Sequence, residues 1–314
     1  MIQNFSSKKI VVLGDVMLDK YIFGSVDRIS PEAPIPIVSV NRETFVPGGA
    51  ANTASNITAL SGKAFLIGVV GNDPAHDLLV RETNKNKINT DDIVVDSRKR
   101  TVQKIRVLGQ SQQLLRIDYD DEEYIESSTE KKIISAMKNH SEIHAFVISD
   151  YAKGVITEEV MKEVHSFVES KKIPLIVDPK PQNRNWYQNA TLITPNKKEA
   201  EGMLGRKISN AQDVERAGLE LSEVLNAHIL ITMGEKGMSL FEKGQKPFHI
   251  PTEAREVYDV SGAGDTVVAT VSLAISCGAS LKEASILANR AAGIKVKKLG
   301  TAPVTAPELL ASCS

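Results

Sequence analysis

At 314 residues the chain is long enough to form one large α/β domain with a substantial core. Its 38 basic and 39 acidic residues leave a formal net charge of −1, which excludes the basic footprint of a nucleic-acid-binding or membrane-surface protein. The two cysteines, Cys277 and Cys313, form neither a disulfide framework nor a zinc pattern, and no apolar run reaches the roughly 18 residues of a membrane span. We therefore expect a cytoplasmic protein that binds neither nucleic acid nor membrane.

Short apolar runs alternate with amphipathic segments along most of the chain. The runs end in Gly, Asp or Pro and lie at 10–14, 65–71, 145–150, 175–179, 191–195 and 229–234. Helical patterns occupy 156–172, 210–226, 263–277 and 281–299. This alternation predicts βαβ units, with helices on both faces of a mostly parallel sheet, and functional residues beyond the carboxyl ends of the strands.

Two regions break this alternation, at about 21–45 and 101–119. Both are rich in Val, Ile and Tyr with interspersed polar residues, which indicates antiparallel strands without an intervening helix. We expect them to form a small sheet that acts as a lid on a single domain spanning 1–314. Such a lid would exclude water from the site beneath it.

The turn Gly262-Ala263-Gly264 immediately precedes Asp265 and an apolar helical run. Small residues at a helix start let backbone N–H groups gather around an anion. A carboxylate there would repel that anion, unless it serves as a general base toward a substrate hydroxyl. The alternative, in which Asp265 is only a helix cap beside a tight turn, is equally compatible with this segment.

Two further segments carry polar residues at helix starts. Gly48 and Gly49 open a helix that contains Asn52, whose amide could bind sugar hydroxyls, although tight packing would also explain the glycines. Asn196 and Glu199 lie three residues apart, and could position a hydrated magnesium ion or a phosphate. Taken alone, this second pair is more typical of a solvated helix start.

The early Gly-Gly-Ala-x-Asn and the late Asp-x-x-Gly-Ala-Gly-Asp together resemble the two signatures of the ribokinase (PfkB-type) carbohydrate kinase family. The resemblance covers essentially the whole chain and implies a ribokinase-like three-layer α/β sandwich with a small antiparallel β lid. Segments 14–19, 28–34, 149–154 and 298–301 are most similar to D-glycero-β-D-manno-heptose 7-phosphate kinases. Such an enzyme would phosphorylate the anomeric O1 and give the 1,7-bisphosphate for ADP-heptose and lipopolysaccharide core synthesis.

The resemblance also assigns expected roles to individual positions. Asp265 would be the catalytic base, and Gly262, Ala263 and Gly264 the anion hole. Glu199, with Asn196, would bind Mg²⁺ through water. The expected sugar-binding positions are Asp15, Asp19, Gly48, Gly49 and Asn52. The expected nucleotide-binding positions are Asn196, Glu199, Thr232, Gly234, Gly237 and Asn289.

A phosphorylated substrate needs additional cations, for which the candidates are Lys153, Lys180, Arg106 and Arg116, with Arg28 a further possibility. For each of them a solvated surface charge is the alternative. The expected ligands are ATP, Mg²⁺ and a small sugar phosphate. A monovalent cation such as K⁺ near 255–261 and a homodimer through the lid strands are open expectations. Bifunctional relatives carry a nucleotidyl-transferring domain after the kinase, and we expect none here.

Other classes fit less well. The chain contains neither a nucleoside-triphosphatase loop nor a dinucleotide fingerprint after the first strand, which argues against a dehydrogenase. Another kinase of the same family, acting on a different sugar, sugar phosphate or nucleoside, is the main alternative. A non-catalytic sugar-sensing relative is the alternative from outside the enzymes.

Overall fold

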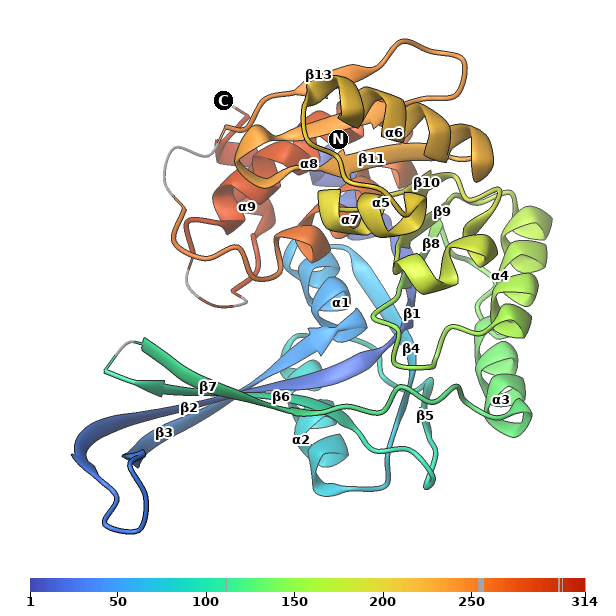
Figure 1. Ribbon diagram of the computed structural model, residues 1–314. Helices are drawn as coiled ribbons and strands as arrows, with labels where there is room; N and C mark the ends of the chain where they lie inside the picture. Colours follow the sequence, from blue (N-terminus) through green and yellow to red (C-terminus); the bar gives the residue numbers. More distant parts are fainter. Residues whose placement is uncertain (111, 254–256, 299, 301, 314) are drawn as a thin grey trace.

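The computed structural model describes residues 1–110, 112–253, 257–298, 300 and 302–313. A nine-stranded sheet forms the body, in the order β13-β12-β11-β10-β9-β8-β1-β4-β5 (Figure 1). Its parallel members are β1 (Lys9–Gly14), β4 (Lys63–Val70), β5 (Ile93–Val95), β8 (Ala145–Ser149), β9 (Leu175–Asp178), β10 (Leu192–Ile193) and β11 (His228–Thr232). The antiparallel strands β12 (Met238–Phe241) and β13 (Phe248–Ile250) complete one edge.

Helices cover both faces of this sheet, as the alternation predicts. One face carries α1 (Ala50–Ala59), α2 (Pro74–Lys85), α7 (Ala263–Ser276), α8 (Leu281–Lys295) and α9 (Ala306–Ala311), beside the 3-10 turn η1 (Ile2–Ser7). The other face carries α3 (Ser127–Lys138), α4 (Glu158–Lys171), α5 (Lys197–Leu204) and α6 (Ala211–Val224), with the 3-10 turn η2 (Pro181–Tyr187). The three-layer α/β sandwich is thus confirmed.

Each face of the sheet has its own hydrophobic core, and β1 shows why. Val12 packs into the core beneath α1 and α7, whereas its neighbours Val11 and Leu13 pack into the core beneath α3 and α4. Successive strand residues point to opposite faces, so a continuous apolar run is what a strand buried on both faces requires. Within the described residues, no helix has the length and apolar character needed to cross a membrane.

The lid is a separate four-stranded sheet that extends away from the body as a twisted arm (Figure 1). Its strands are β2 (Val16–Ile29), β3 (Pro36–Gly49), β6 (Val102–Gly109) and β7 (Gln112–Tyr119), in the order β3-β2-β6-β7. The pairs β2–β3 and β6–β7 are antiparallel, as expected, but β2 and β6 pair in parallel. The chain leaves the lid after β3, builds α1 to β5, and returns in the direction of β2.

The first two lid strands, β2 and β3, extend beyond the expected 21–45, and this brings the lid to the site. Only Asp15 separates β1 from β2, and β3 runs directly into α1. A hydrogen bond from Ala50 N to Asp15 O, 3.0 Å long, closes the junction between these elements. Gly49 has φ 57° there, and a Cβ on it would lie 2.3 Å from Asp15 O, so only glycine fits. The base of the lid and the start of α1 therefore lie together at the carboxyl end of β1.

Candidate active site

The helix α7 begins at the Gly262–Gly264 turn, as the glycine pattern predicts. Gly262 is the N-terminal cap residue, with φ 74°, and no side chain caps this helix end. A Cβ on Gly264 would meet no atom within 4 Å, so the first turn is open on that side. Helix starts carry partial positive charge on their free N–H groups, and this one has room for an anion to approach.

Asp265 lies in the first turn of α7 with 5% of its surface exposed. Its Oδ2 accepts a hydrogen bond from Asn52 Nδ2 at 2.6 Å, and its Oδ1 accepts from Thr53 Oγ1 at 2.7 Å and from Tyr151 OH at 3.2 Å. All three donors are side chains outside α7, so the carboxylate is not a helix cap. Burial raises the pKa of Asp265 above that of an ordinary carboxyl, and the three hydrogen bonds oppose that rise.

Asn52 connects the two glycine-bearing helix starts. Besides its bond to Asp265, its backbone carbonyl accepts from Asn56 Nδ2 at 2.9 Å. Asn56 Oδ1 in turn accepts from Thr266 Oγ1 at 2.7 Å. A Cβ on Gly262 would lie 2.9 Å from Asn52 Nδ2, which brings both signatures into direct contact. This chain of bonds between α1 and α7 fixes the orientation of the Asp265 carboxylate.

The base of the lid adds a second carboxylate to the same region. Asp19 on β2 is buried, and its Oδ1 accepts from Arg106 Nη1 on β6 at 2.5 Å. The Arg106 guanidinium also lies 5.2 Å from the centre of the Tyr21 ring. A Cβ on Gly48 would lie 2.8 Å from Asp19 Oδ2, and the charge of Asp19 contributes to the raised pKa of Asp265. Asp19, Gly48 and Arg106 therefore face the region of Asp265 from the lid.

Asp15, an expected sugar-binding residue, is engaged with the backbone of the loop that follows β8. Its oxygens accept from the N–H groups of Tyr151, Lys153 and Val155 at 2.7, 3.1 and 3.2 Å. Burial and the nearby charge of Asp150 raise the pKa of Asp15 to about 6. The carboxylate thus shapes the 150–155 loop, which carries Tyr151 to Asp265. Contact with a sugar hydroxyl remains a prediction.

Asn196 and Glu199 form a reciprocal capping box at the start of α5. Asn196 Oδ1 accepts from Glu199 N at 3.0 Å, and Glu199 Oε2 accepts from Asn196 N at 2.9 Å. The other oxygen of Glu199 contacts the Lys180 ammonium. The helix start is solvated at Asn196, Lys197 and Lys198, as the sequence alternative has it, whereas Glu199 is buried and ion-paired.

Asp178, at the end of β9, lies beside this pair. Burial, together with the charges of Glu199, Asp265 and Asp150, raises the pKa of Asp178 well above its ordinary value, and Lys180 opposes the rise. Its position after an apolar run was visible in the sequence, but its proximity to Glu199 depends on neighbouring strands. Among the described residues, no group of three or more His, Cys, Asp or Glu side chains is arranged to hold a metal by itself.

The expected nucleotide residues lie near one another. A β-bridge joins Asn196 to Thr232, and the 3-10 turn η3 (Gly234–Lys236) follows. Gly237 packs closely against the backbone of Pro251, since a Cβ there would lie 2.8 Å from Pro251 C. Asn289 Nδ2 on α8 donates to Pro251 O at 2.8 Å, which brings the helix to the same loop.

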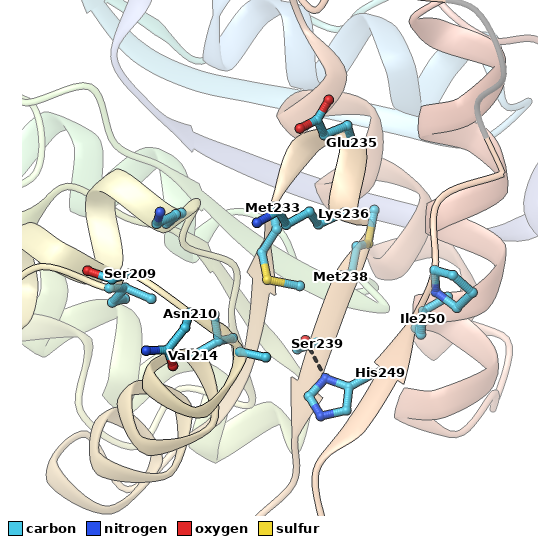
Figure 2. A pocket seen from close by; sticks show the side chains of 14 residues that line it. Ser209, Asn210, Val214, Met233, Glu235, Lys236, Met238, Ser239, His249 and Ile250 are labelled. Atoms are coloured by element: carbon cyan, nitrogen blue, oxygen red, sulfur yellow. Dashed lines mark hydrogen bonds between the residues drawn. The ribbon is translucent and has the colours of Figure 1, made fainter.

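A cavity of about 580 Å³ adjoins η3 from the α6 side. Figure 2 shows Met233, directly after β11, on the same side of the sheet as Ser209 and Asn210 at the start of α6, whereas the Met238 side chain packs into the core on the other face. Ser239 and His249 form a hydrogen bond of 2.7 Å at its floor (Figure 2). Pro251, whose carbonyl accepts the hydrogen bond from Asn289, lines this cavity, whereas Asn289 itself does not.

Four of the expected phosphate-binding cations, Lys153, Lys180, Arg106 and Arg116, have carboxylate partners, whereas Arg28 on β2 is an exposed residue. Lys153 Nζ lies 3.0 Å from Asp120 Oδ2 and 2.9 Å from Glu122 Oε1, just beyond the end of β7. Arg116 forms a bidentate ion pair with Asp118, with two hydrogen bonds, on the exposed strand β7. Lys180 Nζ also lies 5.2 Å from the centre of the ring of Tyr151, the residue whose hydroxyl donates to Asp265.

Sequence reasoning missed two side chains that bind Asp265 directly, Thr53 and Tyr151. Thr53 sits next to Asn52, but the helical register that turns it toward α7 is visible only in the fold. Tyr151 reaches Asp265 because Asp15 shapes its loop. Residues 254–256 lie outside the described residues, so the expected cation loop at 255–261 is described only from Val257 onward. Leu299 and Thr301 of the 298–301 segment also lie outside them.

Comparison with known proteins identifies the same family as the two glycine-containing sequence motifs. The family model for the pfkB family carbohydrate kinases matches residues 7–308. The chain is 44% identical over 98% of its length to the Bifunctional protein HldE of Desulfatibacillum aliphaticivorans. It is 39% identical over 98% of its length to the protein of that name from a Vibrio cholerae strain. It spans only 63% and 64% of the length of these two relatives.

Solved structures share the fold. Arabidopsis thaliana ribokinase complexed with ribose and ATP aligns with a TM-score of 0.76 at 20% identity, over 97% of this chain and 98% of that one. Phosphofructokinase-2 from Escherichia coli, in complex with substrates and products, aligns with a TM-score of 0.80 at 19% identity over 97% of both chains. The fold is therefore ribokinase-like. Because the family model matches nearly the whole chain, the chain belongs to the pfkB family of carbohydrate kinases, which are phosphotransferases with an alcohol group as acceptor.

Proposed function

We propose that this enzyme transfers the γ-phosphoryl group of ATP to the anomeric O1 of D-glycero-β-D-manno-heptose 7-phosphate. The observation that carries the phosphotransfer chemistry is the buried Asp265 carboxylate beside the open, uncapped start of α7. The choice of sugar rests on the segments that resemble heptose 7-phosphate kinases, such as 14–19 and 149–154. The identity with the HldE proteins over 98% of the chain supports it.

The transfer step assigns a task to each group at the start of α7. The sugar O–H gives its proton to the Asp265 carboxylate as its oxygen bonds to the γ-phosphorus. The bond from that phosphorus to the β–γ bridging oxygen breaks, and ADP leaves with the electron pair. The N–H groups of the Gly262–Gly264 turn stabilise charge on the phosphoryl oxygens. Asn52, Thr53 and Tyr151 hold the carboxylate in the orientation that accepts the proton.

The nucleotide would lie along Asn196, Thr232, Gly234, Gly237 and Asn289. This is supported by the bridge between Asn196 and Thr232 and by the contacts of Gly237 and Asn289 with Pro251. Magnesium would fit beside Glu199 and Asp178, because burial and the charge of Glu199 raise the pKa of Asp178 and a divalent cation would offset that negative charge. Those two carboxylates would hold it through water, and the ion would neutralise phosphate charge.

The sugar would lie between the base of the lid and Asp265. Asp19, Gly48 and Gly49, with Asn52, are the proposed contacts for its hydroxyls. Its 7-phosphate would form an ion pair with a lysine that is paired with a carboxylate in the free enzyme. Lys153 and Lys180, beside the 150–155 loop, are the candidates. The ion pairs of Lys153 with Asp120 and Glu122 would then exchange for a pair with the phosphate.

A substrate panel tests the proposal. ATP consumption is measured with heptose 7-phosphate, unphosphorylated heptose, fructose 6-phosphate, ribose and a nucleoside. We expect kcat/KM for heptose 7-phosphate to exceed that for every other sugar by at least about 100-fold, the discrimination of a site that pairs a charged group. A higher kcat/KM for another sugar would replace the heptose assignment and leave the kinase chemistry intact.

Lys153→Ala tests the phosphate contact. We expect it to raise KM for the phosphorylated sugar about 10-fold or more while KM for ATP stays within about 2-fold, since one charge-assisted bond is lost. Lys162→Ala, an exposed lysine of α4, is the matched control. Equal effects of Lys153→Ala on both substrates would reject the assignment.

A further inference from the structure

A lysine is completely buried behind the Gly262–Gly264 turn. Lys295 is the last residue of α8 and has 0% of its surface exposed, which makes it one of the largest fully buried side chains. A buried ammonium costs several kcal/mol unless it is paired, so such residues are rare outside functional or structural networks. Neither the phosphotransfer step nor the binding sites described above use it.

The Lys295 ammonium links the loop that follows α8 to the loop that precedes α7. Its Nζ donates to Gly300 O at 2.5 Å, and Gly300 N donates to Asp259 Oδ2 at 2.9 Å. The other oxygen of Asp259 accepts from Ser261 N at 2.8 Å, directly before the turn. Lysine, glycine and aspartate thus form one hydrogen-bonded unit, which we name the Lys295–Gly300–Asp259 clamp.

The end of α8 also holds the loop that leads into the turn. Val296 O accepts from Tyr258 N at 2.8 Å and from Asp259 N at 3.2 Å. A Cβ on Gly262 would lie 3.5 Å from Lys295 Cε, so the lysine stem backs the cap residue of α7. Burial lowers the pKa of Lys295, and the charges of Asp259 and Asp265 oppose that fall. The ammonium therefore stands within electrostatic range of the catalytic carboxylate.

We propose that Lys295 is a positioning residue for phosphoryl transfer, an internal cation that fixes the Gly262–Gly264 turn and replaces any monovalent cation at residues 257–262. The proposal rests on the anion-binding role proposed for that turn. The Gly300 carbonyl and the Asp259 carboxylate would attract a small cation, and the lysine already supplies their positive charge. A second cation there would be repelled at short range. The K⁺ expectation drawn from the sequence is thereby replaced.

The first test uses the unmodified enzyme and the sugar of the panel that supports the fastest ATP consumption, so it does not depend on the heptose assignment. Turnover is compared in chloride salts of K⁺, NH₄⁺ and tetramethylammonium at equal ionic strength. We expect kcat to agree within about 2-fold in all three, because the internal charge is present in each. A kcat that K⁺ raises about 5-fold or more over tetramethylammonium would overturn the proposal.

The second test removes the ammonium. Lys295→Met keeps the length of the side chain without its charge, and we expect kcat to fall at least about 10-fold, the scale of a misplaced catalytic turn. Lys295→Ala leaves space for a small cation. We expect K⁺ or NH₄⁺, but not tetramethylammonium, to raise the kcat of this variant at least about 3-fold. Lys298→Met, which removes an ion pair with Glu308 at the same helix end, should keep kcat in every salt.

A purely structural role would give a different pattern. It predicts a lower melting temperature for Lys295→Met and Lys295→Ala, with normal kcat per folded molecule and no response to K⁺ or NH₄⁺. That pattern would overturn the proposal. If neither variant folds, the salt comparison on the unmodified enzyme decides. Loss of activity in Asp265→Asn is independent of both tests, so failure of the clamp and failure of the base assignment remain distinguishable.

Discussion

At the residue scale, the reactivity of Asp265 depends on a balance between burial and hydrogen bonding. Burial favours the neutral acid, whereas donation from Asn52, Thr53 and Tyr151 favours the carboxylate. The net result is a raised pKa, which makes the carboxylate a better proton acceptor than an exposed aspartate. Removing any one donor should raise the pKa of Asp265 further.

Thr53→Val removes a donor that stabilises the charged form of Asp265. The pKa of Asp265 should rise further, so the acid side of the kcat/KM profile should move to higher pH by about half a unit to one unit. The measurement is the pH profile with saturating ATP. Thr58→Val on the same helix is the control, since Thr58 Oγ1 donates to Ser55 O and not to Asp265. An unchanged profile for Thr53→Val would argue against Asp265 as the base.

At the element scale, Asp15 holds the loop that carries Tyr151 to the site. Three backbone N–H groups converge on a carboxylate whose pKa is raised to about 6. Because the folded state favours the protonated form, the stability that Asp15 contributes is fully present below its ordinary pKa. It is lost as pH rises through about 6.

Asp15→Asn removes this titration. The difference in unfolding free energy between wild type and Asp15→Asn should therefore shrink between pH 4.5 and pH 8, by up to about 2 kcal/mol. Urea unfolding at several pH values measures it. The exposed Asp27→Asn serves as the control for loss of a carboxylate. A difference that grows with pH would contradict the direction of the Asp15 pKa shift.

How much the sequence predicts also differs between elements. The glycine pattern predicts the start of α7, and the Ser280–Glu283 spacing predicts the capping box that begins α8, because both signals are local. The parallel pairing of β2 with β6 could not be predicted, since it depends on where the chain re-enters the lid. The contacts Tyr151–Asp265 and Lys295–Gly300 depend on loop geometry that no local pattern specifies.

At the scale of the whole molecule, the lid exposes an apolar edge. All residues of β7 are exposed, including Leu115 at 49%, Ile117 at 41% and Tyr119 at 44%. These three alternate residues lie on one face of an edge strand, which is a template for pairing with another chain. Together with the expectation from the sequence, this supports a homodimer formed through the lids.

If the lids form a homodimer, Leu115→Lys combined with Ile117→Lys should convert it to a monomer. Charges on the paired apolar face would be desolvated without partners, at a cost that exceeds the stability of a modest interface. Analytical ultracentrifugation measures the change in mass. Gln113→Lys, on the same strand, should leave the dimer intact. A wild-type protein that sediments as a monomer at micromolar concentration would contradict the lid interface.

The most direct test of the kinase account is the turnover of Asp265→Asn. The account predicts a loss of kcat of at least about 100-fold, the usual scale for a general base, with ATP affinity unchanged. The variant should be as stable as wild type at pH 8, because a neutral amide avoids burying the charge that raises the pKa of Asp265. A kcat within about 3-fold of wild type in that folded variant would contradict the assignment of Asp265 as the base.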